Sequence, residues 1–212
     1  MKKHIRNGLL EIGAWHALSL ARSIPEIVAW INHGCIGAAP HSIKKRIVKS
    51  YLARFALDSF VETGTYLGET LDYIAKTGVR CTSIELAPDL FHAACVRFHG
   101  RNNVKLLLGD SGVELPRLLD MIAGPTLFWL DGHYSAGITA GNDEITPIQK
   151  ELNAILSHHI SDHVVLIDDA RCFDGSSNYP TLGQIARVVE LDGRYQLQIS
   201  TDIIRLTPRR VA

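Results

Sequence analysis

Short apolar runs alternate with segments of helical periodicity over most of the chain. The apolar runs cover residues 60–63, 81–86, 104–108, 126–130 and 164–167. Apolar residues three and four positions apart then predict helices over residues 69–76, 88–98, 114–122, 147–156 and 182–190. Apolar strands without polar alternation are buried on both faces, so this order predicts an α/β fold in which helices cover both sides of a parallel sheet.

The two ends of the chain break this alternation. Residues 195–199 and 203–206 are both strand-like, and only three residues separate them. A link that short permits only a hairpin, so we expect an antiparallel pair of strands at the carboxyl end. At the other end, helical patterns cover residues 9–21, 25–32 and 42–55. We therefore divide the chain into a helical extension, residues 1–57, and a main domain, residues 58–212.

Composition and charge narrow the expected partners and compartment. The chain has 212 residues, enough for one well-buried α/β domain. Lys plus Arg and Asp plus Glu are equal at 22 each, so no overall field draws the protein to nucleic acid, and a small-molecule partner is expected. Four scattered cysteines favour reduced thiols in a cytoplasm. We expect no transmembrane segment, because no apolar run is long enough.

The most informative segment is residues 61–70, where a strand-like run meets a helical pattern through a turn with two glycines. A tight turn of this kind usually holds a nucleotide-like ligand. Gly64 would let the backbone approach the ligand, and Gly68 would let the helix pack against the strand. Glu62 places a carboxylate where a pyrophosphate would otherwise bind. A positively charged ligand without phosphate, such as S-adenosylmethionine, suits this turn better.

Two further strand ends extend this constellation. Glu85 follows Gly64 by 85 − 64 = 21 positions, a spacing that lets a carboxylate accept both ribose hydroxyls. Nicotinamide enzymes share that spacing, and a solvated glutamate at a strand end would look the same. Gly109, Asp110 and Ser111 end the third strand. Their alternative interpretation is local, because Asp110 suits a turn and Ser111 with Glu114 fits a helix capping box.

The β-α order, the terminal hairpin and these motifs resemble class I S-adenosylmethionine-dependent methyltransferases from about residue 58 to the end. The resemblance implies a Rossmann-like, doubly wound, mostly parallel seven-stranded sheet with an antiparallel carboxyl-terminal hairpin. It places Glu62, Gly64 and Gly68 beside methionine, Glu85 beside ribose, and Asp110 with Ser111 beside adenine. The whole cofactor-binding set expected from it is Glu62, Thr63, Gly64, Thr65, Tyr66, Gly68, Thr70, Glu85, Leu86, Gly109, Asp110, Ser111 and Asp131. The turn has fewer glycines than in many members, and the Thr63 and Thr65 hydroxyls are expected to replace backbone contacts.

Three aspartates at strand ends suggest a metal. Asp131 follows the fourth strand, and Asp168 and Asp169 follow the fifth. Carboxylates gathered at one edge repel one another unless a cation intervenes, and Mg²⁺ prefers such oxygen ligands. The pattern is similar to that of the metal-dependent sugar O-methyltransferases of the macrocin and demethyldecosyl-novobiocin type. Three points stand against it. Adjacent strand residues face opposite ways, Arg171 could instead form a structural salt bridge with one of the pair, and Asp131 could serve alone in a metal-free enzyme.

The expected proton acceptor is His133, with Asp131 second. His133 lies in a long segment, residues 132–145, that we interpret as a lid or substrate clamp able to bind a polyol. The alternatives are a solvent-facing histidine and a disordered insertion.

These features together predict transfer of a methyl group to a hydroxyl oxygen of a small molecule, with a sugar or glycoside and Mg²⁺ assistance as the specific form. Two rivals remain: a nicotinamide-dependent oxidoreductase, and an inactive module that binds S-adenosylmethionine. The N-terminal helices are expected to cap the active site, to form a homodimer contact or to rest on a membrane. The third of them carries Lys44, Lys45, Arg46 and Lys49, which are interpreted as the polar face of an ordinary amphipathic helix, with contact to a phosphate or a lipid headgroup as the alternative.

Overall fold

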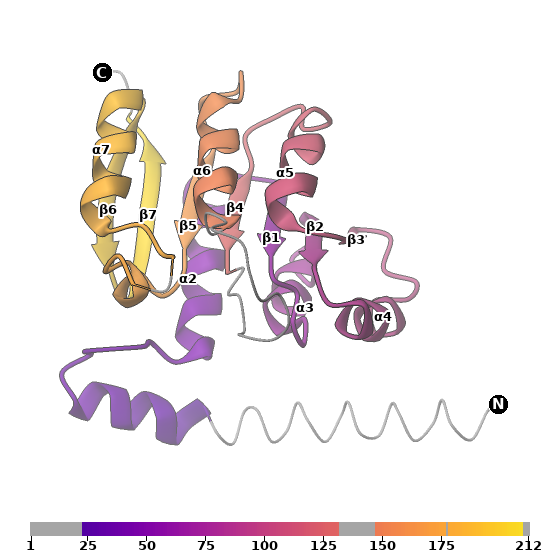
Figure 1. Ribbon diagram of the computed structural model, residues 1–212. Coiled ribbons are helices and arrows are strands. Elements are labelled where there is room, and N and C mark those ends of the chain that lie inside the picture. The colour runs from indigo at the N-terminus through magenta and orange to yellow at the C-terminus, as the bar shows by residue number, and fades with distance from the viewer. Residues whose placement is uncertain (1–22, 132–146, 177, 210–212) are drawn as a thin grey trace.

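Seven strands form one sheet in the order β3-β2-β1-β4-β5-β7-β6 (Figure 1). The computed structural model describes residues 23–131, 147–176 and 178–209. Its strands are β1 (Ser59–Thr63), β2 (Arg80–Glu85), β3 (Val104–Leu108), β4 (Leu127–Leu130), β5 (Val164–Ile167), β6 (Tyr195–Ser200) and β7 (Ile203–Pro208). β1 to β5 pair in parallel, whereas β7 is antiparallel to both β5 and β6. The predicted mostly parallel sheet with a terminal hairpin is confirmed.

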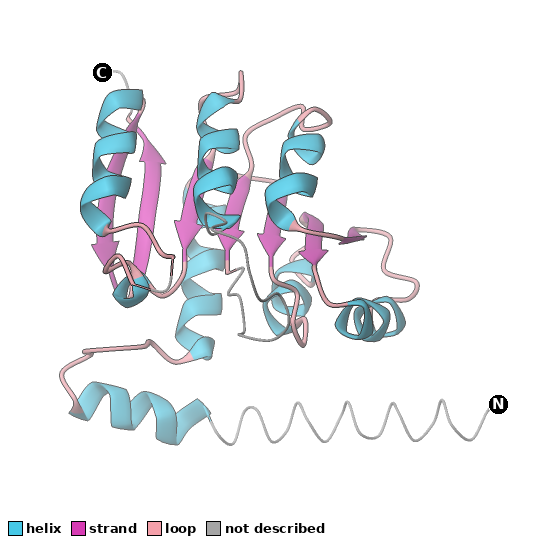
Figure 2. Cartoon of the chain, viewed as in Figure 1, coloured by secondary structure: helices cyan, strands magenta, loops and turns pink. Residues whose placement is uncertain are grey.

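Helices cover both faces of this sheet (Figure 2). They are α2 (His41–Arg54), α3 (Glu69–Ala75), α4 (Pro88–Arg97), α5 (Ser111–Leu119), α6 (Pro147–Ser157) and α7 (Leu182–Asp192), with a 3₁₀ turn at Ala170–Cys172. Residues 23–32 form a further helix. α5, α6 and α7 lie on one face, and α2, α3 and α4 on the other. α5 begins three residues earlier than its apolar pattern predicts, because Asp110 caps it.

The sheet separates two apolar clusters, and the alternation along β4 shows how. Phe128 belongs to the cluster beneath α5, α6 and α7, while Trp129 belongs to the cluster beneath α2, α3 and α4. Successive strand residues point to opposite faces, so a strand covered on both sides must be apolar throughout. Val48, Tyr51 and Leu52 of α2 are part of the second cluster. α2 therefore packs into the core, although it precedes the domain boundary expected at residue 57.

The carboxyl ends of the parallel strands meet at one edge of the sheet. The strand order reverses beside β1, because β2 flanks it on one side and β4 on the other. Crevices at such reversal points are where open α/β sheets bind ligands. In Figure 1 the helix of residues 23–32 lies below this edge. Within the described ranges, every helix is too short or too polar to cross a membrane.

Candidate functional site

The turn between β1 and α3 has a conformation that requires glycine. Gly64 and Gly68 adopt left-handed φ angles of 82° and 69°. Between them, Tyr66 is also left-handed, with a φ of 47°, and the Gly68 N–H donates to the Thr65 carbonyl at 2.7 Å. A Cβ on Gly68 would lie 2.8 Å from Cε2 of Phe98. Gly68 is therefore favoured by its backbone angle and by the close approach of Phe98 at the end of α4, whereas the sequence had suggested close packing of its helix against the strand.

Glu62 lies buried at the end of β1, beneath this turn. Its Oε1 accepts a hydrogen bond from the Ser83 hydroxyl at 2.8 Å, and Ser83 Oγ lies 2.6 Å from Thr65 Oγ1. Burial raises the pKa of Glu62 to about 8, and the charges of Asp131 and Glu85 act in the same direction. The carboxyl group of Glu62, expected from the sequence to carry a negative charge, is therefore largely protonated at neutral pH. A cationic ligand beside it would favour its ionised form.

Glu85 joins the turn to the end of β2. Its Oε2 accepts the Tyr66 backbone N–H at 2.8 Å, and its Oε1 accepts the Ala87 N–H at 2.9 Å. The two backbone hydrogen bonds hold the carboxylate in place. Each of its oxygens can accept a second hydrogen bond, so the group can still bind ligand hydroxyls. Leu86, the next residue, is 51% exposed. An exposed apolar side chain beside an ordered carboxylate suits a nucleoside, with its flat base and its polar ribose.

At the end of β3, Asp110 is the N-cap of α5, and its side chain accepts the Gly112 N–H at 2.8 Å. The sequence suggested a turn role for Asp110 and a capping box beginning at Ser111 as local alternatives. The structure has Asp110 as the helix N-cap instead, and the capping box is wrong because Ser111 is the first helical residue. Nearby, the carboxyl group of Glu151 from α6 is fully buried close to Ser111 and Thr63, and burial raises its pKa to about 7. Neither of its oxygens has a hydrogen bond of ordinary geometry with a described residue.

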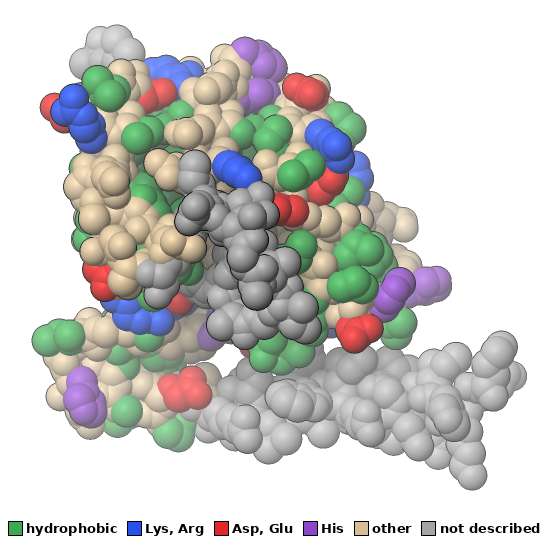
Figure 3. Space-filling model, viewed as in Figure 1, with side chains coloured by type: hydrophobic (Ala, Val, Ile, Leu, Met, Phe, Trp, Pro, Cys, Tyr) green, Lys and Arg blue, Asp and Glu red, His purple; other side chains and the backbone are tan. Residues whose placement is uncertain are grey.

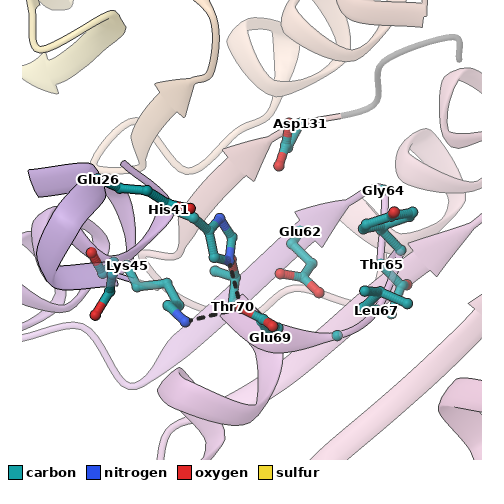
Figure 4. A pocket seen from close by; sticks show the side chains of 14 residues that line it. Glu26, His41, Lys45, Glu62, Gly64, Thr65, Leu67, Glu69, Thr70 and Asp131 are labelled. Atoms are coloured by element: carbon teal, nitrogen blue, oxygen red, sulfur yellow. Dashed lines mark hydrogen bonds and ion pairs between the residues drawn. The ribbon is translucent and has the colours of Figure 1, made fainter. Parts of the chain in front are cut away.

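A cavity of about 410 Å³ opens beside the turn. Figure 4 shows Glu62 and Asp131 between the turn on one side and α2 on the other. Seven of the expected site residues line it together: Glu62, Gly64, Thr65, Tyr66, Gly68, Thr70 and Asp131. The N-terminal region supplies Ser23, Glu26, His41, Ser42 and Lys45, and the turn and α3 add Leu67 and Glu69. The cavity thus lies between the sheet edge and the N-terminal helices.

His41 and Lys45 give this cavity a polar wall that sequence patterns did not reveal. His41 Nε2 lies 3.5 Å from Thr70 Oγ1 and 3.6 Å from Glu69 Oε2, and Lys45 Nζ lies 3.3 Å from the same Glu69 oxygen (Figure 4). Desolvation, followed by the charge of Lys45, lowers the pKa of His41 to about 4, although 43% of its side chain is exposed and water screens part of this effect. Its imidazole is therefore neutral at neutral pH, able to accept a hydrogen bond but only weakly basic.

The aspartates after β5, expected from the sequence to bind a metal, are paired with basic side chains in the structure. Lys44 Nζ lies 2.6 Å from Asp168 Oδ1 and 2.7 Å from Asp169 Oδ1, and Arg171 Nη1 binds Asp169 Oδ1 at 2.7 Å. Burial raises the pKa of Asp168, and the charge of Lys44 acts in the opposite direction. Among the described residues, no group of three or more potential ligands could hold a metal ion. The Arg171 salt bridge is confirmed, and the solvated role assigned to Lys44 is wrong because only 7% of that residue is exposed.

The remaining expected residues lie at neighbouring strand ends outside the cavity, or among residues that the structure does not describe. Thr63, Glu85, Leu86, Gly109, Asp110 and Ser111 follow or end the neighbouring strands but do not line the cavity. His133 and the whole of the long segment 132–145 lie outside the described residues. Sequence analysis did not identify His41, Lys44, Lys45 or Glu151. A basic or acidic residue on a helix beside apolar positions resembles a surface residue until the packing of that helix is known.

Charged side chains do not gather into a patch on the face seen in Figure 3, where acidic and basic residues are interspersed. This distribution gives that face no basic stripe of the kind that tracks a nucleic acid backbone. It is consistent with the equal numbers of acidic and basic residues in the chain.

Known proteins resemble this chain in structure but not in sequence. No protein-family model matches it, and no curated protein is similar in sequence. An O-methyltransferase from Bacillus cereus, in complex with S-adenosylhomocysteine, is 13% identical with a TM-score of 0.59, over 89% of this chain and 90% of its own. The O-methyltransferase TomG from Streptomyces achromogenes, in complex with S-adenosylmethionine, is 15% identical with a TM-score of 0.56, over 90% and 88%. The 23S rRNA methyltransferase ErmE is 14% identical with a TM-score of 0.53, over 82% and 70%. The chain has the fold of class I S-adenosylmethionine-dependent methyltransferases.

Proposed function

We propose that this protein is an enzyme that transfers the methyl group of S-adenosylmethionine to a hydroxyl oxygen of a small molecule. The observation that carries the proposal is the cavity at the reversal point of the sheet, bordered by the glycine turn and by Glu62 and Asp131. The buried carboxyl group of Glu62 and the half-buried one of Asp131 favour the cationic methionine end of the cofactor at this point. The ordered carboxylate of Glu85, beside the exposed Leu86, suits the ribose and the adenine.

In the reaction, the acceptor oxygen attacks the methyl carbon while the carbon–sulfur bond breaks. The products are a methyl ether and neutral S-adenosylhomocysteine, and the hydroxyl proton must leave. The cofactor supplies the activated methyl group, so the protein contributes mainly orientation and a proton acceptor. Asp131 lines the cavity and is our candidate acceptor, with His133 as the other. His41 is better suited to orienting the acceptor hydroxyl, because its pKa of about 4 makes it a weak base.

The acceptor is proposed to be rich in hydroxyl groups, such as a sugar or glycoside. The N-terminal wall of the cavity is polar, with Ser23, Glu26, His41, Ser42 and Lys45. Side chains of this kind bind hydroxyls in both donor and acceptor roles. We infer that residues 1–57 act as the substrate-side element of the enzyme. Mg²⁺ assistance is not part of the proposal, because Lys44 lies between two of the carboxylates that would bind the ion.

A calorimetric titration with S-adenosylhomocysteine tests the cofactor assignment. We expect micromolar binding to the wild-type protein and about 10- to 100-fold weaker binding to Glu85→Gln, which replaces a charged acceptor by a neutral amide. Glu190→Gln is the matched control, because Glu190 is exposed on α7. Thermal unfolding of each variant separates lost affinity from lost folding.

Absence of S-adenosylhomocysteine binding would contradict the proposal. Binding of NADH instead would favour the oxidoreductase. If S-adenosylhomocysteine binds and no S-adenosylhomocysteine forms from S-adenosylmethionine with any sugar, glycoside or phenol, the inactive binding module gains support. The same assay with RNA as the acceptor covers the chemistry of the ErmE neighbour.

A further inference from the structure

Lys44 occupies an unusual position for a lysine. It belongs to α2, yet its ammonium group lies at the carboxyl end of β5, 125 positions away in sequence from Asp169. The residue is only 7% exposed. Buried lysines are uncommon because an ammonium group loses its hydration, and they persist where a negative partner compensates. Here two carboxylates compensate one ammonium.

The geometry of Asp168 and Asp169 shows how two adjacent residues reach the same cation. β5 ends at Ile167, and Asp169 adopts a left-handed φ of 53°. That conformation removes the alternation of an extended strand, so both side chains turn toward α2. Both Oδ1 atoms then bind Lys44 Nζ, at 2.6 Å and 2.7 Å.

The same two oxygens carry further hydrogen bonds. Asp168 Oδ1 also accepts the Asp169 backbone N–H at 2.7 Å, and Asp169 Oδ1 also accepts Arg171 Nη1 at 2.7 Å. Arg171 in turn binds Asp202. A divalent ion that used these oxygens would have to displace the ammonium group, because two cations cannot share one position.

We propose that Lys44 is the protein's own cation at this edge of the sheet. Its ammonium takes the position that a divalent ion would hold between Asp168 and Asp169, so methyl transfer proceeds without a metal. Lys44 is a positioning residue: it keeps the paired carboxylates compensated and holds α2, which carries His41 and Lys45, against the edge. The consequence of these ion pairs for catalysis rests on the proposed function, but the ion pairs themselves do not.

Mn²⁺ titration followed by electron paramagnetic resonance tests the proposal directly, because the signal of the free ion falls when it binds. We expect no stoichiometric binding to the wild-type protein at millimolar Mn²⁺. In Lys44→Gln the two carboxylates lose the ammonium group they share, and Arg171 remains on Asp169 alone. We then expect one Mn²⁺ per chain, with affinity raised at least about tenfold. Adding Asp168→Asn should abolish the gained binding, and Lys44→Arg should show none.

The matched control is Lys76→Gln. Lys76 binds Asp72 Oδ2 at 2.7 Å, but its side chain is exposed, and Arg97 and Arg101 also contact Asp72. Its removal should create no Mn²⁺ site, which shows that losing a lysine beside a carboxylate is not sufficient.

Two results would overturn the proposal. One is a wild-type protein that binds one Mn²⁺ per chain and loses it in Asp168→Asn; this arm remains decisive even if Lys44→Gln does not fold. The other is a folded Lys44→Gln variant that binds Mn²⁺ no better than the wild type. The S-adenosylhomocysteine titration reports on the proposed function separately, so the two failures are distinguishable.

Discussion

Replacing Gly68 by alanine tests whether the turn between β1 and α3 is constrained by packing as well as by backbone angle. Gly68 has a φ of 69°, and an added Cβ would lie 2.8 Å from Cε2 and 3.1 Å from Cζ of Phe98. Gly78, which follows the carboxyl end of α3, is a matched control for Gly68. Its φ is 86°, and an added Cβ there meets nothing within 4 Å. The two glycines therefore share the left-handed strain and differ in the steric overlap.

The expected magnitudes follow from these two contributions. A left-handed conformation costs an alanine about 1–2 kcal/mol. Overlap with a packed side chain adds about 1–3 kcal/mol when the surroundings must shift. Gly68→Ala should therefore lower the free energy of unfolding by about 2–5 kcal/mol, the sum of both contributions. Gly78→Ala should lower it by about 1–2 kcal/mol, from the backbone alone.

Urea denaturation followed by circular dichroism measures both variants on the same scale. A double-mutant cycle with Phe98→Leu isolates the overlap, because the smaller side chain leaves room for the new Cβ. We expect Gly68→Ala to cost less in the Phe98→Leu background than in the wild type. Equal costs for Gly68→Ala and Gly78→Ala, with no coupling to residue 98, would refute the argument that Phe98 requires a glycine at this position.

Two further predictions concern buried carboxyl groups. Burial raises the pKa of Glu62 to about 8, so the folded state retains a proton that the unfolded state loses near its ordinary pKa, and the stability contributed by the protonated group is lost as pH rises through about 8. In cofactor-free protein, Glu62→Gln should flatten the fall in urea midpoint between about pH 5 and pH 8, and an unchanged slope would contradict this assignment. Glu151, whose pKa burial raises to about 7, loses its contribution in the same direction, so Glu151→Gln should be at least as stable as the wild type at pH 8.5 by thermal unfolding. A clear loss of stability at that pH would mean that an ionised Glu151 is well paired.

Much of the fold followed from patterns a few residues long. Apolar runs and helical spacing predicted the strands and most helices. A helix that buries one face repeats its apolar residues every three to four positions, and a strand that is buried on both faces is apolar throughout. The three residues between the apolar runs 195–199 and 203–206 predicted an antiparallel hairpin, because so short a link cannot cross a sheet; in the structure two residues separate β6 from β7. The glycines at positions 64 and 68 indicated a tight turn from strand to helix, and in the structure both adopt left-handed φ angles, which other residues reach only at a steric penalty.

The candidate site was only partly predictable. Glu62, Gly64 and Asp131 were expected together because strand ends in a parallel sheet share an edge, and they line one cavity. The partner of Asp168 and Asp169 was not predictable, because Lys44 reads as a surface residue of an amphipathic helix. Only the docking of α2 against the sheet brings its ammonium group to them.

The sequence alone therefore determined the order and type of the elements and the chemistry available at each strand end. Both depend on local backbone preferences and on hydrophobic periodicity. The tertiary structure alone decided which charges meet, since an ion pair over 125 positions depends on how distant helices pack. It also decided which groups hold a proton, as with Glu62 and His41, because a pKa depends on burial by residues from the whole chain.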